Sequence, residues 1–406
     1  MDLSFSAEDE VFRAEARAWL THQLDGPHAV VRDRGGPGDE HALFDKRLAW
    51  EHTLAEAGWT CVGWPTEFGG RGLSLHRQVI WFEEYARAGG PGRLGHIGET
   101  LLGPTLIHFG NADQQARFLP GIVAGDDLWA QGYSEPDAGS DLANVATRAE
   151  RDGDDWVITG QKVWTSLAHW ARWAFVLCRT DRDAPKHKGL SYLLVPLDQD
   201  GVEIRPIRQI SGASEFNEVF FEGARTSVAN TVGAPGDGWK VANGTLAFER
   251  GASTLGQQLR FTNEFDALVA TARANGAIDD PVLRQRLTDA WLRLRIMRLL
   301  MLRVLSATES SLAPAAMVTK LYWASWHRDL GELAMGVLGA AALDWSAHDI
   351  DDPERLTPFH QLFLFSRSDT IYAGSNEIQR NIIAERALGL PREPRPPVPS
   401  APPVHT

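Results

Sequence analysis

Side chains able to hold a cofactor are concentrated in the segment Gln131 to Asp141 (QGYSEPDAGSD). The segment supplies hydroxyl groups, a carboxylate at Glu135 before a turn-forming proline, and glycines such as Gly139 that let the backbone approach a ligand. Its hydroxyl groups belong to Tyr133, Ser134 and Ser140. Residues of these types in a loop predict contacts to a bound cofactor.

A second segment of this kind, Trp164-Thr165-Ser166, ends a run of residues that alternate between apolar and polar. It places an aromatic ring beside small hydroxyl donors. Because it follows the first segment closely in the sequence, we expect it to lie on the next strand of the same small sheet. The two segments would then form one face.

Together with two later motifs, these segments resemble the flavin-dependent acyl-CoA dehydrogenase family. The motifs are SEPDAGSD, WTS, FERG around Glu249, and the terminal IYAGSNEIQRNIIAERALGLPR. They occur in the order and at the separations usual in that family, and the resemblance extends from about Leu3 to Arg392. A chance match to one short motif would not reproduce this arrangement.

The resemblance implies oxidation of an acyl-CoA thioester to the trans-2-enoyl-CoA, as in fatty acid β-oxidation. No side chain accepts a hydride, so the acceptor must be a cofactor, which in this family is FAD. Electrons would then pass to an electron-transfer flavoprotein. The chain has no G-x-G-x-x-G at a strand-to-helix turn and no P-loop, in agreement with this reading.

By the same resemblance, residues of three segments contact the flavin. They are Gln131, Tyr133, Ser134, Gly139, Ser140, Trp164, Thr165, Ser166, Ser375, Asn376 and Glu377. Trp164 would cover one face of the flavin, and Ser166 would donate towards its N5 and O4 region. For either motif alone, a serine-rich turn or a core tryptophan is the simpler account, and only their combination favours the cofactor.

The base that removes the α-proton is predicted to be Glu249. Many relatives carry a glutamate directly after the tyrosine of the C-terminal motif, where this chain has Ala373, which cannot take a proton. A branch that includes enzymes resembling isovaleryl-CoA and long-chain acyl-CoA dehydrogenases instead places a glutamate before an arginine on the first bundle helix, as in Glu249-Arg250. Apolar neighbours would raise the proton affinity of such a carboxylate. The alternative is a solvated ion pair on a helix.

The substrate-binding residues implied are Ser140, Arg250, Ala373 and Gly374. The main-chain N–H of Ala373 survives the loss of the glutamate side chain and can polarise the thioester carbonyl. Arg250 would face the entrance of the active site. By analogy with its branch, the position of Glu249 indicates branched or bulky acyl groups.

Two elements that reach the neighbouring subunit's FAD in many relatives are absent. Where they carry Arg-x-x-Phe-Gly, this chain reads ATARANGAID, and where they carry a glutamine two residues before paired glycines, it reads Gly336 to Ala340. The family expectation is a homotetramer, a dimer of dimers. The departures also permit a hetero-oligomer, in which this chain is a non-catalytic or half-site subunit beside a paralogue. An acyl-CoA oxidase is a further alternative.

Length and composition agree with a cytoplasmic enzyme of several packed units. The chain has 406 residues, of which 43% are hydrophobic and 23% charged. Its net charge of −13 argues against nucleic-acid binding. We expect Cys61 and Cys178 to be reduced core residues, and we find no signal peptide, no apolar run of membrane length and no metal-ligand spacing.

The predicted fold is mainly α with a central β domain. Residues 1–127 read as an N-terminal helical domain, 128–236 as a small antiparallel β-barrel or sandwich, and 237–390 as a C-terminal four-helix bundle. The proline-rich residues 391–406 read as a tail that is disordered or lies on a neighbour. In the bundle, a helix beginning at Pro281 is expected to bury one stripe. The stripe consists of Leu283, Leu287, Trp291, Leu294 and Met301.

Overall fold

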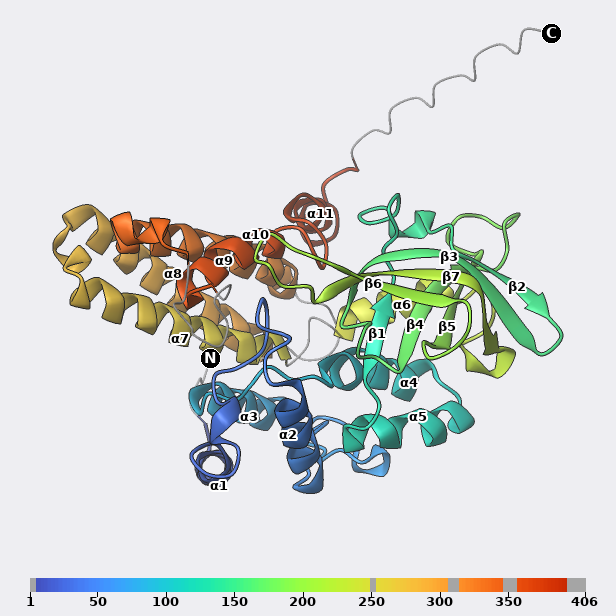
Figure 1. Ribbon diagram of the computed structural model, residues 1–406, viewed down its shortest axis with the longest axis horizontal. Coiled ribbons are helices and arrows are strands. Elements are labelled where there is room, and N and C mark those ends of the chain that lie inside the picture. Colours follow the sequence, from blue (N-terminus) through green and yellow to red (C-terminus); the bar gives the residue numbers. More distant parts are fainter. Residues whose placement is uncertain (1–4, 249–252, 306–313, 346–355, 393–406) are drawn as a thin grey trace, which may run out of the picture.

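The structure is a computed structural model that describes residues 5–248, 253–305, 314–345 and 356–392. In Figure 1 the helices of the C-terminal part lie on the left, the strands lie on the right, and the N-terminal helices run beneath both. The mainly helical fold with a central β domain is therefore confirmed.

The N-terminal part consists of five α-helices within the described residues. They are α1 (Ala7–Leu24), α2 (Phe44–Glu56), α3 (Leu75–Arg87), α4 (Gly103–Phe109) and α5 (Ala112–Ala124). The first begins at a capping box, in which the Ser6 hydroxyl accepts from the Asp9 amide and the Asp9 carboxylate accepts from the Ser6 amide. It buries Phe12, Ala16 and Leu20 against α3, as its periodicity predicts.

The strands form one open sheet rather than a closed barrel. They are β1 (Trp129–Gly132), β2 (Arg148–Asp152), β3 (Asp155–Ser166), β4 (Trp173–Arg179), β5 (Leu190–Pro196), β6 (Val202–Ile207), β7 (Phe216–Ser227) and β8 (Thr231–Val232). Their order is β6-β7-β3-β2-β4-β5-β8, and β1 pairs with β4 in parallel. The sheet is not closed, so the term barrel is loose, and the contacts of β4 with β1 and β2 are parallel whereas the other pairs are antiparallel.

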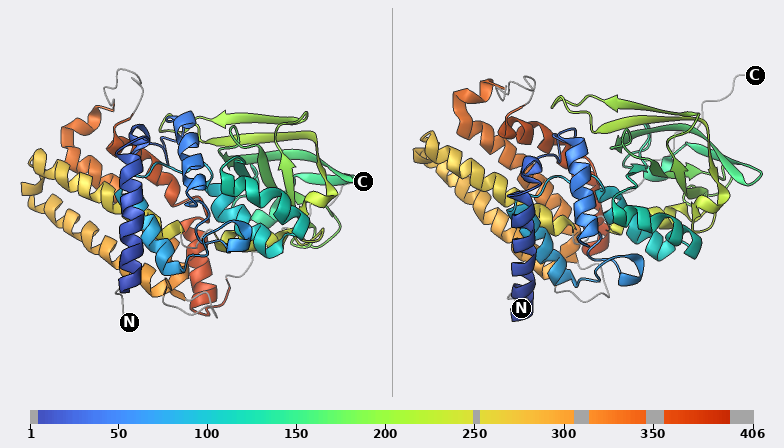
Figure 2. Two further views of the ribbon diagram at one scale, coloured as in Figure 1. Left: turned by 90° about the horizontal axis from the view of Figure 1, so that it is seen from below. Right: turned by 60° about the horizontal axis from the view of Figure 1, so that its bottom comes forward.

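The sheet does not need to close into a barrel, because helices cover the apolar face that would otherwise form the interior of a barrel. Side chains of β1, β4 and β5 share one apolar cluster with α4, α5 and α6 (Gly238–Phe248). Figure 2 shows these helices against the strand layer from two further directions. Accordingly β4 and β5 are buried along most of their length, whereas β6 at the edge is mostly exposed or half-buried.

Four long helices pack together in the C-terminal part, as predicted. They are α7 (Ser253–Ala274), α8 (Pro281–Leu305), α9 (Pro314–Leu338) and α10 (Pro358–Asp369). Phe261, Leu268, Leu294 and Trp326 belong to their shared core. After α10 the chain turns into α11 (Asn376–Ile382), which lies between the bundle and the strands along the long axis of the molecule (Figure 1).

The buried stripe expected on α8 is only partly correct. Leu287, Leu294 and Met301 are buried, but Trp291 is 44% exposed. It shares the outer face of α8 with Leu292, Ile296 and Leu299, each close to half exposed. The residues of α8 that face α7 and α9 are buried, so this outer face is apolar beyond what the bundle itself requires.

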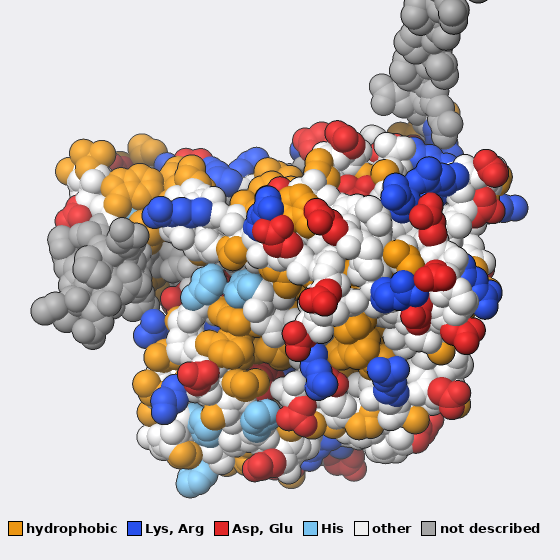
Figure 3. Space-filling model, turned by 45° about the vertical axis from the view of Figure 1, so that its right-hand side comes forward, with side chains coloured by type: hydrophobic (Ala, Val, Ile, Leu, Met, Phe, Trp, Pro, Cys, Tyr) orange, Lys and Arg blue, Asp and Glu red, His pale blue; other side chains and the backbone are white. Residues whose placement is uncertain are grey.

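Both cysteines are buried and free, as expected. None of the helices in the described residues is both long and apolar enough to cross a membrane. The face shown in Figure 3 carries Lys and Arg side chains interspersed with Asp and Glu. On that face, attraction for a polyanion would have to come from local groups.

Candidate flavin and substrate site

A buried ion pair holds the loop that follows β1. Lys162 of β3 is fully buried, and its Nζ donates to Glu135 Oε1 at 2.7 Å, to the Tyr133 carbonyl at 3.1 Å and to the Leu177 carbonyl at 2.7 Å. The Glu135 carboxylate also accepts from the amides of Ala146 and Thr147, at 2.6 and 2.9 Å. Both ends of the segment from 133 to 147 are thereby tied to the sheet.

The electrostatics of this pair follow from burial and mutual attraction. Burial acts to raise the pKa of Glu135, but the Lys162 ammonium and the amide donors hold that pKa below its ordinary value. Burial lowers the pKa of Lys162, and Glu135 opposes the shift. Sequence reasoning missed the pair. The available signal was a lysine at an inward position of an alternating strand, in line with the buried Trp156 and Ile158.

Strand β3 presents Trp164 through an irregularity in its pairing. Lys162 pairs with Val219 and Thr165 with Asn217, so β3 has one more residue than β7 between these pairs. Such a bulge re-aims a side chain. Trp164 has a left-handed φ of +60° and is 57% exposed, and its ring meets Phe216 edge to face at a centroid distance of 6.2 Å. The indole is an exposed flat surface on a rigid strand.

The neighbours of Trp164 fit a flavin. Thr165 is 1% exposed, and within the described residues its hydroxyl has no hydrogen-bond partner. Ser166 is half-buried at the end of the strand. An exposed indole beside a buried, unsatisfied hydroxyl and a partly accessible one suits a planar ligand with polar edges. These residue types and their exposure fit a flavin, and their contact with FAD stays a prediction.

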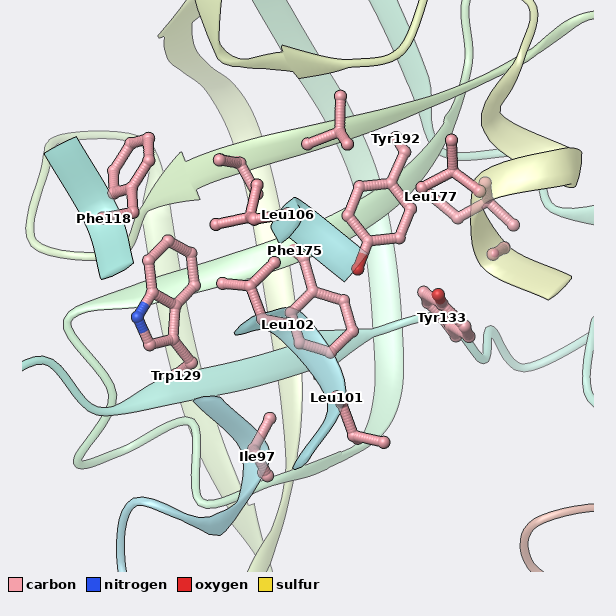
Figure 4. Close-up of a cluster of buried hydrophobic side chains, with 14 of the residues drawn as sticks. Ile97, Leu101, Leu102, Leu106, Phe118, Trp129, Tyr133, Phe175, Leu177 and Tyr192 are labelled. Carbon is pink, nitrogen blue, oxygen red and sulfur yellow. The ribbon is translucent and has the colours of Figure 1, made fainter. Parts of the chain in front are cut away.

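The predicted residues of the first loop divide into two groups. Tyr133 is 5% exposed, and its ring meets Phe175 and Tyr192 edge to face in the apolar cluster of Figure 4. Its side chain therefore belongs to the core. The Ser134 carbonyl accepts from the Val163 amide at 2.9 Å, which places this serine one residue from Trp164 across the sheet.

The remaining members of that loop are more accessible. Gly139 and Ser140 are exposed, and Gln131 is half-buried on β1 opposite Phe175. The hydrogen bond between Ser134 and Val163 joins the loop after β1 to β3. The two segments are nevertheless not on neighbouring strands, because β1 pairs with β4 whereas β3 pairs with β2 and β7.

The C-terminal motif forms a tight turn between α10 and α11. Ala373 has a left-handed φ of +52°, followed by Gly374 at +85°. Ser375 caps α11 by accepting from the Ile378 amide, so its hydroxyl is used within the fold. Asn376 is 5% exposed with its Oδ1 unsatisfied within the described residues, whereas Glu377 is exposed. The interactions of the turn attach it to α9 and α10.

The predicted base Glu249 and its neighbour Arg250 lie outside the described residues. The flanking elements are described: α6 ends at Phe248 and α7 begins at Ser253. Their predicted roles stay predictions.

Sequence reasoning also missed Glu215, which lies directly before Phe216. It is 3% exposed, and its Oε2 accepts from the Gly38 amide at 3.0 Å while its carbonyl accepts from the Leu167 amide at 2.8 Å. Burial and the nearby Glu40 raise its pKa to about 7. Glu215 thus links the N-terminal domain to the strand ends near Trp164. No sequence motif marks it.

The two stretches that depart from the family pattern lie together. The Asn275 side chain donates to the Val337 carbonyl at 2.8 Å and so joins the turn after α7 to the end of α9. The ATARANGAID stretch and the Gly336 to Ala340 stretch are therefore parts of one end of the bundle. The two departures from the family pattern therefore lie on one surface of the bundle.

An open sheet between helical domains, with an exposed indole and a buried hydroxyl at the end of its interior strand β3, fits a flavin-binding dehydrogenase. Family models cover nearly the whole chain. Residues 6–126 match "Acyl-CoA dehydrogenase, N-terminal domain", residues 130–224 the middle domain, and residues 236–388 the C-terminal domain. The chain belongs to the acyl-CoA dehydrogenase family and is an oxidoreductase that binds FAD and dehydrogenates acyl-CoA.

Individual relatives agree. Acyl-CoA dehydrogenase IpdE1 of Mycolicibacterium smegmatis is 56% identical over 396 residues, covering 95% of this chain and 99% of the relative. The structure titled "Tcur3481-Tcur3483 steroid ACAD" matches at a TM-score of 0.84 and 34% identity, covering 97% of this chain and 100% of that one. The ChsE4-ChsE5 complex from Mycobacterium tuberculosis matches at a TM-score of 0.80 and 28% identity, covering 97% and 100%.

Replacing Lys162 with Met should lower the free energy of unfolding by about 3–5 kcal/mol, because the change leaves the Glu135 carboxylate buried and unpaired. Urea unfolding followed by circular dichroism measures the loss. Lys186→Met is the matched control. Lys186 forms an exposed ion pair, at 2.5 Å, with Asp141 of the same 133–147 segment that Lys162 holds. Its cost should stay below about 1 kcal/mol. Equal costs would contradict a structural role for the buried pair.

Replacing Glu215 with Gln should change how stability depends on pH. With a pKa of about 7 when folded against an ordinary 4.5, Glu215 holds a proton in the folded protein that the unfolded chain has released. Wild-type stability should therefore fall as pH rises across this window. Relative to wild type, the variant should gain up to about 3 kcal/mol between pH 5 and pH 8. Unfolding at both pH values measures this, with the exposed Glu222→Gln as control. Parallel profiles for the two variants would refute it.

Proposed function

We propose that this chain catalyses the α,β-dehydrogenation of a bulky, steroid-derived acyl-CoA thioester, with Glu249 as the base. The observation that carries the proposal is the exposed indole of Trp164 held by a bulge beside the buried hydroxyl of Thr165. Together these groups offer a flat surface and a hydrogen-bonding hydroxyl at the end of an interior strand. The bound FAD would supply the hydride acceptor.

The chain's own residues would perform four tasks. Trp164, Thr165 and Ser166 would orient the ring system, and the Lys162–Glu135 pair would keep the loop that contains Ser140 in place. The Ala373 amide would polarise the thioester carbonyl, which lowers the cost of removing the α-proton. Glu249 would take that proton, as the resemblance to the branch with a glutamate before an arginine implies.

The substrate class rests on the named relatives. The matching structure at 34% identity is titled a steroid ACAD, and it covers nearly the whole of both chains. A bulky acyl group also agrees with the analogy drawn from the place of Glu249. General fatty acid β-oxidation remains the alternative for the physiological pathway, and substrate choice decides between them.

We further propose that the working assembly pairs this chain with a paralogous subunit. The structures that match at TM-scores of 0.84 and 0.80 carry titles that each name two proteins. In this chain, the joined surface at Asn275 and Val337 lacks the elements that reach a neighbour's FAD in many relatives. The exposed apolar face of α8, with Trp291 and Ile296, offers area for another subunit. A homotetramer remains the competing arrangement.

In the FAD-containing complex, Glu249→Gln should greatly slow flavin reduction while leaving FAD bound, because the amide cannot take the α-proton. We expect the rate of flavin bleaching under anaerobic conditions to fall by about 10²- to 10⁴-fold. The panel consists of octanoyl-CoA, isovaleryl-CoA and a CoA thioester of a steroid side chain, and the visible spectrum measures the rate.

Glu222→Gln, an exposed change on β7, is the control and should bleach as wild type does. If both variants bleach equally fast, another residue is the base. Preference for octanoyl-CoA over the steroid thioester would overturn the substrate class.

The subunit proposal predicts that FAD content depends on the partner. Purified alone, the chain should carry much less than one FAD per chain, whereas coexpression with a paralogous acyl-CoA dehydrogenase from the same genome should yield a yellow complex of both chains. Absorbance and light scattering give the flavin ratio and the mass. A stable yellow homotetramer from this chain alone would contradict the proposal.

A further inference from the structure

A buried histidine joins three helices of the bundle. His327 of α9 is 8% exposed, and its Nδ1 lies 2.5 Å from Asp369 Oδ2 at the end of α10. Its Nε2 lies 2.8 Å from Glu264 Oε2 of α7. The Phe261 ring stacks on the imidazole at a centroid distance of 4.4 Å. No residue of this cluster belongs to the motifs of the family resemblance.

The geometry makes the ring a cation. Each ring nitrogen faces a carboxylate oxygen, and only the doubly protonated imidazolium donates from both. Burial acts to lower the pKa of His327, but Glu264 and the hydrogen bonds to both carboxylates outweigh it and raise that pKa to about 9. The other charged groups beside the cluster are Arg260, 3.7 Å from Glu264, and Lys320, whose Nζ donates to the Asp369 carbonyl at 2.6 Å.

The cluster continues into the turn that contains Ala373. The second oxygen of Asp369, Oδ1, accepts from the Tyr372 hydroxyl at 2.5 Å. The Tyr372 amide donates to the Ser368 carbonyl at 3.0 Å, so this tyrosine is held at both its ring and its backbone. A chain of direct contacts therefore runs from His327 through Asp369 to the residue before Ala373.

The turn needs such support. Ala373 has a left-handed φ of +52°, a conformation that is unfavourable for any residue with a Cβ. Beyond it, Gln379 donates to the carbonyl of Ala373 at 3.2 Å. The direction of the Ala373 N–H is thus set between Tyr372 on one side and Gln379 on the other.

We infer that His327 is a positioning residue, which acts through Asp369 and Tyr372 to hold the Ala373 amide in the direction that the reaction requires. The inference rests on the proposed function for the catalytic part and on the described contacts for the positional part. If His327 lost its charge, the buried Asp369 carboxylate and the half-buried Glu264 carboxylate would face each other across a neutral ring. Asp369 would then hold Tyr372 less firmly, and the strained turn would relax.

The test compares His327→Gln, Tyr372→Phe and the double variant in the purified FAD-containing protein. Hydrogen exchange of the amides from 371 to 374 reports the turn directly. At pH 7 each single variant should exchange about 10-fold faster than wild type, and the double variant no faster than either single one, because all three changes break one chain of contacts. His360→Gln is the control, since His360 is a buried bundle histidine whose partners are Thr357 and the Ala342 carbonyl.

The sign of the pH effect is fixed by the raised pKa of His327. Its contribution is fully present below its ordinary value of 6.5 and is lost as pH rises through about 9. After division by intrinsic exchange rates, the difference between wild type and His327→Gln should therefore close above pH 9. Additive effects of the two single changes, or a turn that exchanges equally in wild type and His327→Gln at pH 7, would overturn the inference.

A kinetic arm separates this inference from the proposed function. With the panel thioester that bleaches wild type fastest, His327→Gln should lower kcat about 10-fold with little change in KM, while His360→Gln leaves both near wild type. If no thioester bleaches wild type, the proposed function fails, and the exchange data still decide the positional claim. Loosened exchange with unchanged kcat would overturn the catalytic part alone.

Discussion

A single buried ammonium organises the face on which the chemistry of this protein depends. Lys162 has no access to solvent, so it must be satisfied by protein groups, and its partners come from β4 and from the loop after β1. Because Glu135 in turn accepts two backbone amides, the loop has little freedom to move away from β3. Two residues beyond Lys162 the strand bulges and presents Trp164. The same strand therefore carries both the buried Lys162 and the exposed Trp164 that we propose contacts the cofactor.

The sequence predicted those features that local chemistry determines. The helix predicted to begin at Pro281 begins there in the structure, where the fixed φ of proline suits the first turn. The sequence predicted less well those features that depend on residues far apart in the chain. Closure of the sheet depends on whether helices cover its face. The exposure of Trp291 depends on which elements pack against α8. The spacing of apolar residues along one segment determines neither.

The same distinction holds for the site. Hydroxyl-rich motifs identified the loop and the end of β3, but they did not reveal that the Tyr133 ring is used in the core. The sequence also does not predict the left-handed backbone conformation of Trp164 and Ala373, because these residues adopt it only under tertiary constraint. His327 meets Glu264 across 63 residues and Asp369 across 42, which no short motif can encode.

The exposed indole of Trp164 and the unsatisfied hydroxyl of Thr165 also bear on the supply of this protein in a cell. A fold that keeps a large aromatic surface in water and a buried donor unpaired gains free energy from any ligand that covers both. By mass action, each tenfold excess of such a ligand over its Kd adds about 1.4 kcal/mol to the folded state. If FAD covers both groups, as proposed, it would stabilise the folded protein as well as supply the hydride acceptor, and flavin depletion would lower the amount of folded protein.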